Sequence, residues 1–242
     1  MYRLILCLLL GMGLQVRAQD TLQLHPDLRL IALGPHTWQH TSNSIIEPWG
    51  KVSSNGLIVV DQKEALLFDT PMEDSLTERL LKYLREDWKV QVKAFVPNHW
   101  HDDCVAGMDV LQAQGVPVYT LATTNAILRD HQLPQADFTF SERILLRAGN
   151  VDVLCRHYGA GHTVDNIVTF VPADRVLFGG CQVKSVHATS LGNTADADLA
   201  TWPHTIARIQ VAHPGIQIVV PGHGGASGQE ALDHTLHLLK AH

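Results

Sequence analysis

Hydrophobic and polar residues alternate along the chain in blocks that predict strands and helices in turn. Apolar runs of strand length lie at 28–38, 56–69, 90–96, 116–119, 143–146, 151–157, 166–171, 175–178 and 216–220. The run 56–69 is interrupted only by a polar turn at 61–63, which predicts a hairpin whose strands are buried on both faces. The pattern therefore predicts a protein rich in buried β-strands.

Helical periodicity fills the gaps between these strands. Apolar residues recur every fourth position over 76–88, where Ser75 and Glu78 have the spacing of a capping box. Further helices are expected over 107–114, from a cap at Thr123 to residue 131, over 198–212 and over 228–241. Trp49, between a proline and a glycine, predicts a loop tip within 45–51.

The order of these elements predicts the architecture. Each half of the chain has strands first and then strands alternating with helices, so two similar halves would bury their apolar sheets against each other with helices outside. No flexible Gly/Ser linker separates the halves. We therefore expect residues 20–242 to form a single domain.

Residues 1–19 differ in kind from the rest. A short basic start is followed by an almost wholly apolar stretch at 4–16 and by Ala18 and Gln19 before a polar residue. This pattern predicts a secretory signal peptide that is removed on export, and hence a periplasmic protein of the Gram-negative type. The apolar stretch is shorter than the ~20 residues that span a bilayer, so no stable membrane association is expected.

Charge and cysteine content narrow the function classes. Without residues 1–19 the chain has 16 basic and 24 acidic residues, a net charge of −8; this argues against nucleic acid as a partner, because phosphate binding needs a basic face. Three cysteines remain, Cys104, Cys155 and Cys181. An odd number in an exported protein suggests that at least one thiol has another role, such as metal ligation. A Cys104–Cys155 disulfide stays open as an alternative.

Candidate metal chemistry is concentrated at 98–104, directly after the apolar run 90–96. His99, His101, Asp102, Asp103 and Cys104 offer imidazole, carboxylate and thiol groups, which are the ligand types of zinc. Asp103 is preferred over Asp102 as the ligand only because of its position in the motif.

Three later fragments repeat the pattern of a strand end followed by a glycine-containing loop. They are 159–163, 179–181 and 221–225, and they supply His162, Cys181 and His223. Together with His99, His101 and Asp103 these residues make six ligands, enough for two zinc ions with three protein ligands each and an open position on each ion. The alternative without a functional role is that the histidines and Cys181 are ordinary core residues.

On these residues the chain resembles the metallo-β-lactamases of class B, subclass 1, over essentially the whole mature chain. The motif His99-x-His101-x-Asp103 is shared across that superfamily, whereas Cys181 stands where general hydrolases of the superfamily usually carry a bridging aspartate. Cys104 stands where many of those hydrolases, and subclass 3, carry a metal-binding histidine, and subclass 2 would have Asn in place of His99. The resemblance extends through 180–185 and 192–197.

The resemblance implies a fold and a metal content. The fold is α/β (α+β), a four-layer αββα sandwich of two mixed β-sheets packed face to face. The cofactors are two Zn²⁺ per chain, one held by His99, His101 and His162 and the other by Asp103, Cys181 and His223.

It also implies a reaction, the hydrolysis of the β-lactam amide of penicillins, cephalosporins and carbapenems by metal-bound hydroxide, which confers antibiotic resistance. Asp103 would orient the water, and Lys184 would pair with the substrate carboxylate. Asn193 would steady that carboxylate or the carbonyl oxygen. Trp49 would tip a mobile loop over apolar substrate groups, and Asp69 would lie behind the metals. We expect a monomer whose partner is the small-molecule β-lactam.

Several alternatives stay open. Three residues have a purely structural interpretation as an alternative: Lys184 as a solvated surface lysine, Asn193 as a plain turn residue and Trp49 as a core residue. The chain as a whole could instead be another hydrolase of the fold, acting on thioesters, lactones or phosphodiesters, or a non-catalytic metal-binding protein. Cys181, and the lack of a histidine at position 104, count against the other hydrolases.

Overall fold

Two mixed β-sheets form the centre of the protein. The computed structural model describes residues 20–242, and the predicted signal peptide lies outside them. The first sheet consists of β1 (Thr21–His25), β2 (Leu28–Ala32), β3 (Thr37–Ile46), β4 (Gly50–Asp61), β5 (Glu64–Phe68) and β6 (Gln91–Val96) in that spatial order. Its strands are antiparallel except for the parallel pair β5–β6.

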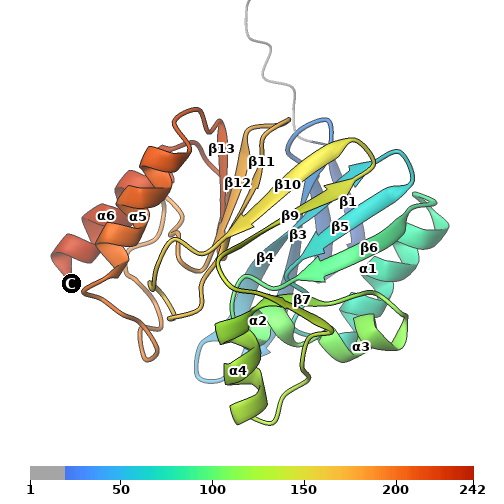
Figure 1. The fold of residues 1–242 in the computed structure, drawn as a ribbon, viewed down its shortest axis with the longest axis horizontal. Helices are drawn as coiled ribbons and strands as arrows, with labels where there is room; N and C mark the ends of the chain where they lie inside the picture. Colours follow the sequence, from blue (N-terminus) through green and yellow to red (C-terminus); the bar gives the residue numbers. More distant parts are fainter. Residues whose placement is uncertain (1–19) are drawn as a thin grey trace, which may run out of the picture.

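The second sheet has the spatial order β13-β12-β11-β10-β9. Its strands are β9 (Arg143–Ala148), β10 (Val151–Arg156), β11 (Val168–Val171), β12 (Val176–Gly180) and β13 (Ile218–Pro221). Only β12 and β13 run parallel. A small parallel pair, β7 (Tyr119–Leu121) and β8 (Phe138–Phe140), lies beside the main sheets (Figure 1).

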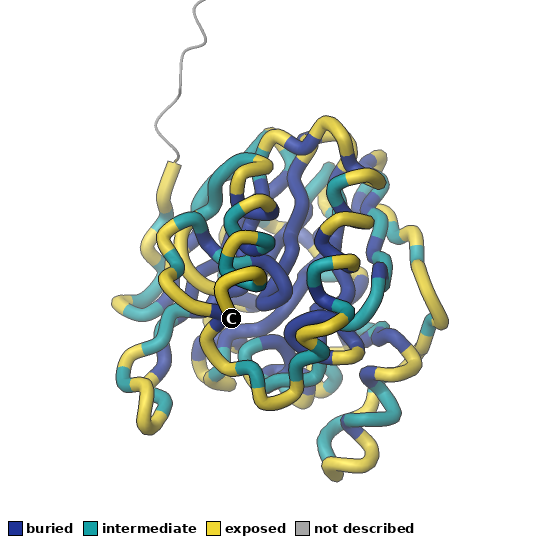
Figure 2. Tube along the Cα trace, turned by 90° about the vertical axis from the view of Figure 1, so that its left-hand side faces the viewer, coloured by how far each residue is buried: buried dark blue, intermediate teal, exposed yellow. Residues whose placement is uncertain are grey.

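Helices cover the outer faces of both sheets (Figure 1). On the first sheet they are α1 (Asp74–Glu86) and α3 (Met108–Ala113), and on the second α5 (Trp202–Ala212) and α6 (Glu230–Ala241). The helices α2 (Asp102–Val105) and α4 (Ala122–Asp130) lie at one end of the sandwich, near β7 (Figure 1). One apolar cluster, including Phe68 and Phe178, fills the space between the sheets. A second joins α1 and α3 to the first sheet, and a third joins α5 and α6 to the second sheet. This confirms the predicted four-layer αββα sandwich, and Figure 2 shows its buried strands between partly exposed helices.

Some predicted boundaries were wrong in the first half. The run 28–38 is two strands, β2 and β3, separated at Gly34-Pro35, and β1 was not predicted. Helix α1 begins at Asp74 after the N-cap Glu73, which makes no side-chain capping hydrogen bond, so the capping box at Ser75 does not exist.

Two further helix starts were also wrong. Thr123 lies inside α4 and does not cap it. Helix α5 begins at Trp202, four residues later than predicted, because the Asp198 carboxylate accepts hydrogen bonds from the backbone N–H and the hydroxyl of Thr201 and holds the preceding residues in a turn. The predicted strand 116–119 is displaced to β7, and both α2 and β8 were missed.

The directions of the strands bring the loops with candidate ligands to the same end of the two sheets. Because β12 and β13 are parallel and β10 has the same direction as β12, the loops after β10, β12 and β13 leave the second sheet at the same end. The loop after β6, in the first sheet, reaches the same end. There the backbone N–H of Ile167 donates to the carbonyl of Asn98 at 2.9 Å. All the predicted metal-binding fragments therefore meet at one end of the sandwich.

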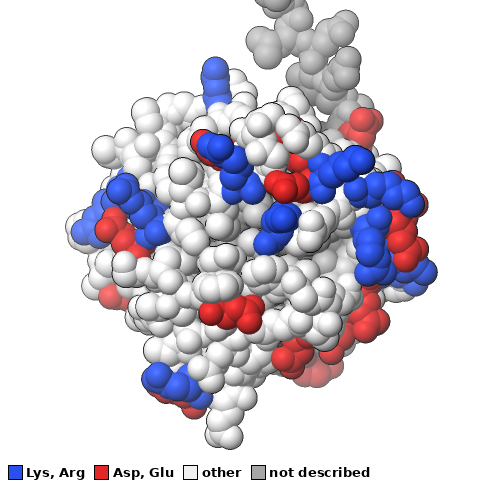
Figure 3. All heavy atoms as spheres, turned by 45° about the vertical axis from the view of Figure 1, so that its right-hand side comes forward, with Lys and Arg blue, Asp and Glu red and all other residues white. Residues whose placement is uncertain are grey.

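Acidic and basic side chains both occur on the face shown in Figure 3, so this face does not carry charge of one sign alone. None of the helices formed by residues 20–242 has the length and apolar character needed to span a bilayer.

Candidate metal centre

The loop after β6 is held rigidly from behind. Asp69, a buried residue with a positive φ of 58°, accepts a hydrogen bond on Oδ1 from the backbone N–H of Asn98 at 2.5 Å. The amide of Asn98 in turn donates to the carbonyl of Ile167 at 2.5 Å. A side chain at Gly180, where φ is 57°, would collide with the Asn98 amide. These contacts fix the backbone on which His99 stands, and they place Asp69 behind the candidate metal ligands as expected.

Helix α2 was not predicted, and it determines where the acidic groups of 98–104 point. Its first turn carries Asp102, which is exposed, and Asp103, whose side chain is only 13% exposed. Cys104 is buried one residue further on. The structure therefore separates the two carboxylates and directs Asp103 toward the histidines.

Three histidines from two loops converge. Nδ1 of His101 lies 3.0 Å from Nε2 of His99 and 3.2 Å from Nε2 of His162. The ring centroids are 4.6 to 5.1 Å apart, with the planes nearly perpendicular. Three ring nitrogens facing one point are a metal-binding arrangement, because at most one of them could satisfy another by a hydrogen bond.

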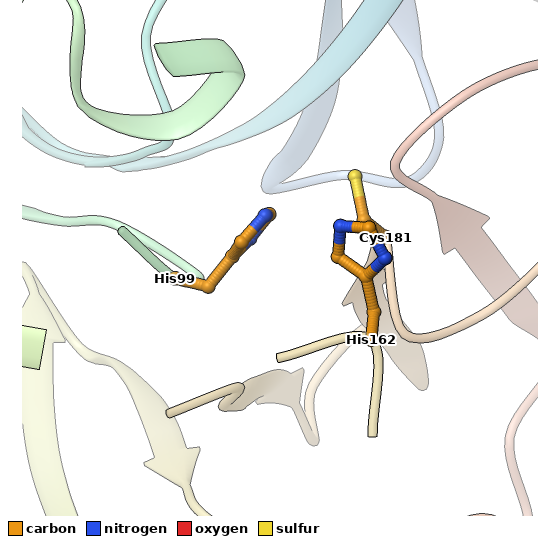
Figure 4. Close-up of side chains that lie close together, drawn as sticks. All are labelled: His99, His162 and Cys181. Carbon is orange, nitrogen blue, oxygen red and sulfur yellow. The ribbon is translucent and has the colours of Figure 1, made fainter. Parts of the chain in front are cut away.

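A second group of donors adjoins the first. Oδ2 of Asp103 lies 3.0 Å from Sγ of Cys181 and 3.3 Å from Nε2 of His223. The two groups are continuous, because donor atoms of His99, His162 and Cys181 also lie within 4.8 Å of one another. Figure 4 shows these three side chains entering the same space from separate segments.

The hydrogen-bond partners of the ring nitrogens that point away from the cluster indicate where each imidazole carries its proton. His101 places Nε2 at 2.9 Å from the Asp196 carboxylate, and His223 places Nδ1 at 2.9 Å from the carbonyl of Ser53. Both partners are acceptors, so we assign a proton to each of these outward nitrogens. The inward Nδ1 of His101 then presents a lone pair. The inward Nε2 of His223 faces the Asp103 carboxylate, and its Cys181 and Asp103 neighbours raise the pKa of His223 well above its usual value, so a bound cation would replace a proton there. His99 has its outward Nδ1 at 3.1 Å from Sγ of Cys104. Imidazole, carboxylate and thiol groups in this arrangement fit the preferences of zinc.

Burial and neighbouring groups set the protonation state of each donor. Desolvation lowers the pKa of His99 to about 3 and that of His162 to about 2, so both imidazoles are neutral at neutral pH. Burial opposes ionisation of Asp103, but the hydrogen bond from His223 and the positive charge of that ring hold the pKa of Asp103 well below its usual range. Burial raises the pKa of Cys181 to about 11, so the thiolate needs a nearby metal cation to form.

The loop that carries His162 is held by α5 and the residues before it. The guanidinium of Arg208 donates to the carbonyl of Tyr158 at 3.0 Å, and the Thr205 hydroxyl donates to that of Ala160 at 2.7 Å. The backbone N–H of Asp198 donates to the carbonyl of Gly161 at 2.9 Å. These bonds fix the chain immediately before His162.

A cavity of about 520 Å³ opens over the donors. Asp103, His162 and His223 form part of its floor, and Lys184, Asn193 and Trp49 line its walls. Lys184 is only partly exposed, which contradicts the alternative of a solvated surface lysine, and burial lowers its pKa. Asn193 is exposed, and its Oδ1 accepts from the backbone N–H of Ala195 at 3.0 Å, so it is a turn residue that also faces the cavity. Trp49 is 66% exposed and therefore is not a core residue.

The structure also shows features that the motifs did not reveal. Asp196, which contacts His101, and the wall residues Trp100 and Met72 were not singled out. The only indication of Asp196 in the sequence is the resemblance over the whole segment 192–197. Cys104 and Cys155, for which a disulfide stayed open, are both buried free thiols.

Comparisons with known proteins place the chain among similar enzymes. No protein-family model matches it. The type 2 metallo-β-lactamase of Bacteroides fragilis is 36% identical over 224 residues, covering 93% of this chain and 90% of that protein. The type 2 metallo-β-lactamase of Bacillus cereus is 33% identical over 208 residues, covering 86% and 81%.

Solved structures agree with this similarity. A metallo-β-lactamase from Pontibacter korlensis matches with a TM-score of 0.85 at 40% identity, covering 89% of this chain and 100% of that one. A structure of the DIM-1 metallo-β-lactamase exposed to ceftazidime has a TM-score of 0.85 at 34% identity, covering 89% and 98%.

Proposed function

Because the chain belongs to the metallo-β-lactamase family, we propose that it is a zinc-dependent β-lactamase that hydrolyses the amide bond of penicillins, cephalosporins and carbapenems and so confers antibiotic resistance. The observation that supports this most directly is the position of two adjoining donor groups on the floor of a cavity that also contains Lys184. A metal-storage protein would need the donors but not the cavity or the lysine.

Six residues would hold two zinc ions. His99, His101 and His162 would hold one, and Asp103, Cys181 and His223 would hold the other. Bound zinc supplies Lewis-acid chemistry that makes a hydrolytic nucleophile available near neutral pH and stabilises developing negative charge.

The protein's own groups position the reactants. The ionised carboxylate of Asp103 accepts a hydrogen bond from the attacking water and orients it toward the amide carbon. Lys184 binds the substrate carboxylate through a charge-assisted hydrogen bond, and the amide N–H₂ of Asn193 donates to that carboxylate or to the carbonyl oxygen. Trp49, at the tip of the β3–β4 hairpin, covers apolar substrate groups and excludes water.

Several wider properties belong to the same proposal. Residues 1–19 direct export and are removed, and residues 20–242 act in the periplasm as a single-domain monomer of two similar halves. The substrate is a small molecule, and neither nucleic acid nor the membrane is a stable partner.

A hydrolysis panel with a metal count tests the proposal. Zinc-loaded protein is given a penicillin, a cephalosporin, a carbapenem and a thioester, with and without chelator. We expect β-lactam ring opening that is lost with chelator and restored by zinc, at two metal ions per chain. Intact β-lactams together with thioester cleavage would instead identify another hydrolase of this fold.

A further inference from the structure

We propose that Trp100, braced by His131, is a fixed aromatic wall of the cavity that selects β-lactams carrying a planar apolar substituent. This inference rests on the proposed β-lactamase function and deepens it. Trp100 lies between two candidate zinc ligands in the sequence and lines the same cavity as Lys184.

The indole of Trp100 is held on two sides. The His131 ring stacks on it, with centroids 4.5 Å apart and planes 25° apart. The His101 ring meets it at 4.6 Å with an angle of 64°. Trp100 also packs against the core cluster beneath α1 and α3. A ring fixed by so many neighbours loses little conformational freedom when a ligand binds, so its contact with a ligand is pre-organised.

The brace comes from a different part of the fold. His131 is exposed and follows α4 directly as its C-cap residue, whereas Trp100 stands on the loop between β6 and α2. Stacking therefore ties the end of α4 to the cavity wall.

Trp100 differs from the other indole of the cavity. Trp49 is 66% exposed at a hairpin tip, whereas Trp100 is only partly exposed. Val52 and Met72 line the cavity as well. A planar substituent on the substrate can stack on the fixed indole, while a small one leaves that surface in water. Aromatic pairs of this kind add to affinity beyond the area they bury.

The competing explanation is that Trp100 only orients His101 for metal binding. In that role, loss of Trp100 would lower the affinity for zinc and would therefore affect the hydrolysis of every substrate alike. The selective role would change KM for one class of substrate and leave the metal content unchanged.

The test compares two β-lactams with the same core, one with a benzyl and one with a methyl side chain. Zinc-loaded wild type, Trp100→Ala, Trp100→Phe, His131→Ala and His131→Phe are measured for KM, kcat and zinc stoichiometry. Arg129→Ala, which removes an exposed side chain near the end of the same helix, is the matched control. Quenching of tryptophan fluorescence on binding to chelator-treated protein gives a readout that does not need hydrolysis.

We expect Trp100→Ala to raise KM for the benzyl substrate about tenfold and for the methyl substrate less than about twofold, with two zinc ions retained. His131→Ala should raise the benzyl KM about threefold, while His131→Phe and Trp100→Phe keep the preference. Equal effects on both substrates, or loss of zinc, would overturn the inference.

The two proposals fail in different ways. If wild type hydrolyses neither substrate, the β-lactamase proposal fails. The wall is then judged by binding alone: tighter binding of the benzyl compound to wild type than to Trp100→Ala supports it, and equal binding overturns it.

Discussion

Oδ2 of Asp196 lies 2.9 Å from Nε2 of His101, although 95 positions separate the two residues. The carboxylate accepts a hydrogen bond from the N–H of this outer nitrogen, so the other ring nitrogen, Nδ1, carries the lone pair that faces His99 and His162. Asp196 is about half exposed, at 45%, so its contribution is mainly to the tautomer and orientation of the ring.

Removing this carboxylate should weaken zinc binding at the three-histidine group. We expect Asp196→Ala to lower the affinity for one zinc ion about 10- to 100-fold. Asp196→Asn should have a smaller effect, because the amide oxygen still accepts the hydrogen bond. Competition with a chromophoric chelator measures both, and Asp109→Asn, an exposed aspartate on α3, is the control. An unchanged affinity in Asp196→Ala would show that His101 needs no outer partner.

The two buried thiols near Asp103 should differ in their effect on metal content. Cys181→Ser should lose one of two zinc ions and most turnover, because a neutral hydroxyl is a poor zinc ligand at neutral pH. Cys104→Ser should keep both ions, since the Cys104 sulfur faces the outer nitrogen of His99 and lies 4.0 Å from Asp103. Metal analysis after dialysis checks the pair. Two ions in Cys181→Ser, or one in Cys104→Ser, would contradict the ligand assignment.

Local patterns were enough to predict the layers and the donors, but not the contacts that orient the donors. The strands around Leu57 and Phe68 are continuously apolar because the sheet is covered on both faces, and such a run is visible in the sequence. The histidines and Cys181 follow strand ends, and strand direction brings them together. Asp196 was missed because an aspartate in a loop acquires its role only when the fold places it beside His101.

Other errors have similar physical causes. The capping box at Ser75 fits the sequence rule, yet Glu73 precedes the helix and makes no cap. The stack of Trp100 on His131 joins the loop after β6 to the C-cap of α4, and nothing within either segment predicts it. Tertiary contacts of this kind determine the details of the cavity, and a single sequence does not contain them in local form.

Loss of the Lys184 ammonium should affect binding more than chemistry. A charge-assisted hydrogen bond contributes about 1.5–3 kcal/mol, so Lys184→Ala should raise KM about 10- to 100-fold with a smaller change in kcat. Steady-state kinetics with a β-lactam and with its carboxylate ester separates the cause, because the ester should lose little. Lys240→Ala, an exposed lysine on α6, is the control. An equal loss for the ester would place Lys184 outside carboxylate binding.

Trp202 links the third core cluster to the segment that follows the candidate ligand Cys181. Its buried indole N–H donates to the carbonyl of Gln182 at 2.8 Å, and Nζ of Lys184 lies 5.3 Å from its ring. Trp202→Phe leaves that carbonyl without its donor and should reduce the free energy of unfolding by about 1–3 kcal/mol. Urea unfolding measures this against Trp88→Phe, whose indole packs on Trp38 and Tyr83. If Trp202→Phe lost no more stability than Trp88→Phe, the hydrogen bond would be unimportant.

His40 should make the protein sensitive to acid in a defined pH range. Its Nε2 lies 3.1 Å from the carbonyl of Asp69 and 3.3 Å from that of Phe68, while its buried Nδ1 has no hydrogen-bond partner among the described residues. Burial lowers its pKa from 6.5 to about 4. The folded protein therefore resists a proton that the unfolded chain accepts, so stability falls as pH decreases from 6.5 to about 4 and His40 has no effect above that range.

The size of this effect is about 3 kcal/mol across the range. His40→Gln can still donate to the same carbonyls but cannot titrate, so its free energy of unfolding should decrease less on acidification by about that amount. Denaturant unfolding at several pH values and fixed zinc measures the difference, since zinc release affects both proteins alike. His204→Gln, at an exposed position on α5, should behave as wild type. Parallel pH profiles for wild type and His40→Gln would show that His40 is already protonated or solvated in the folded state.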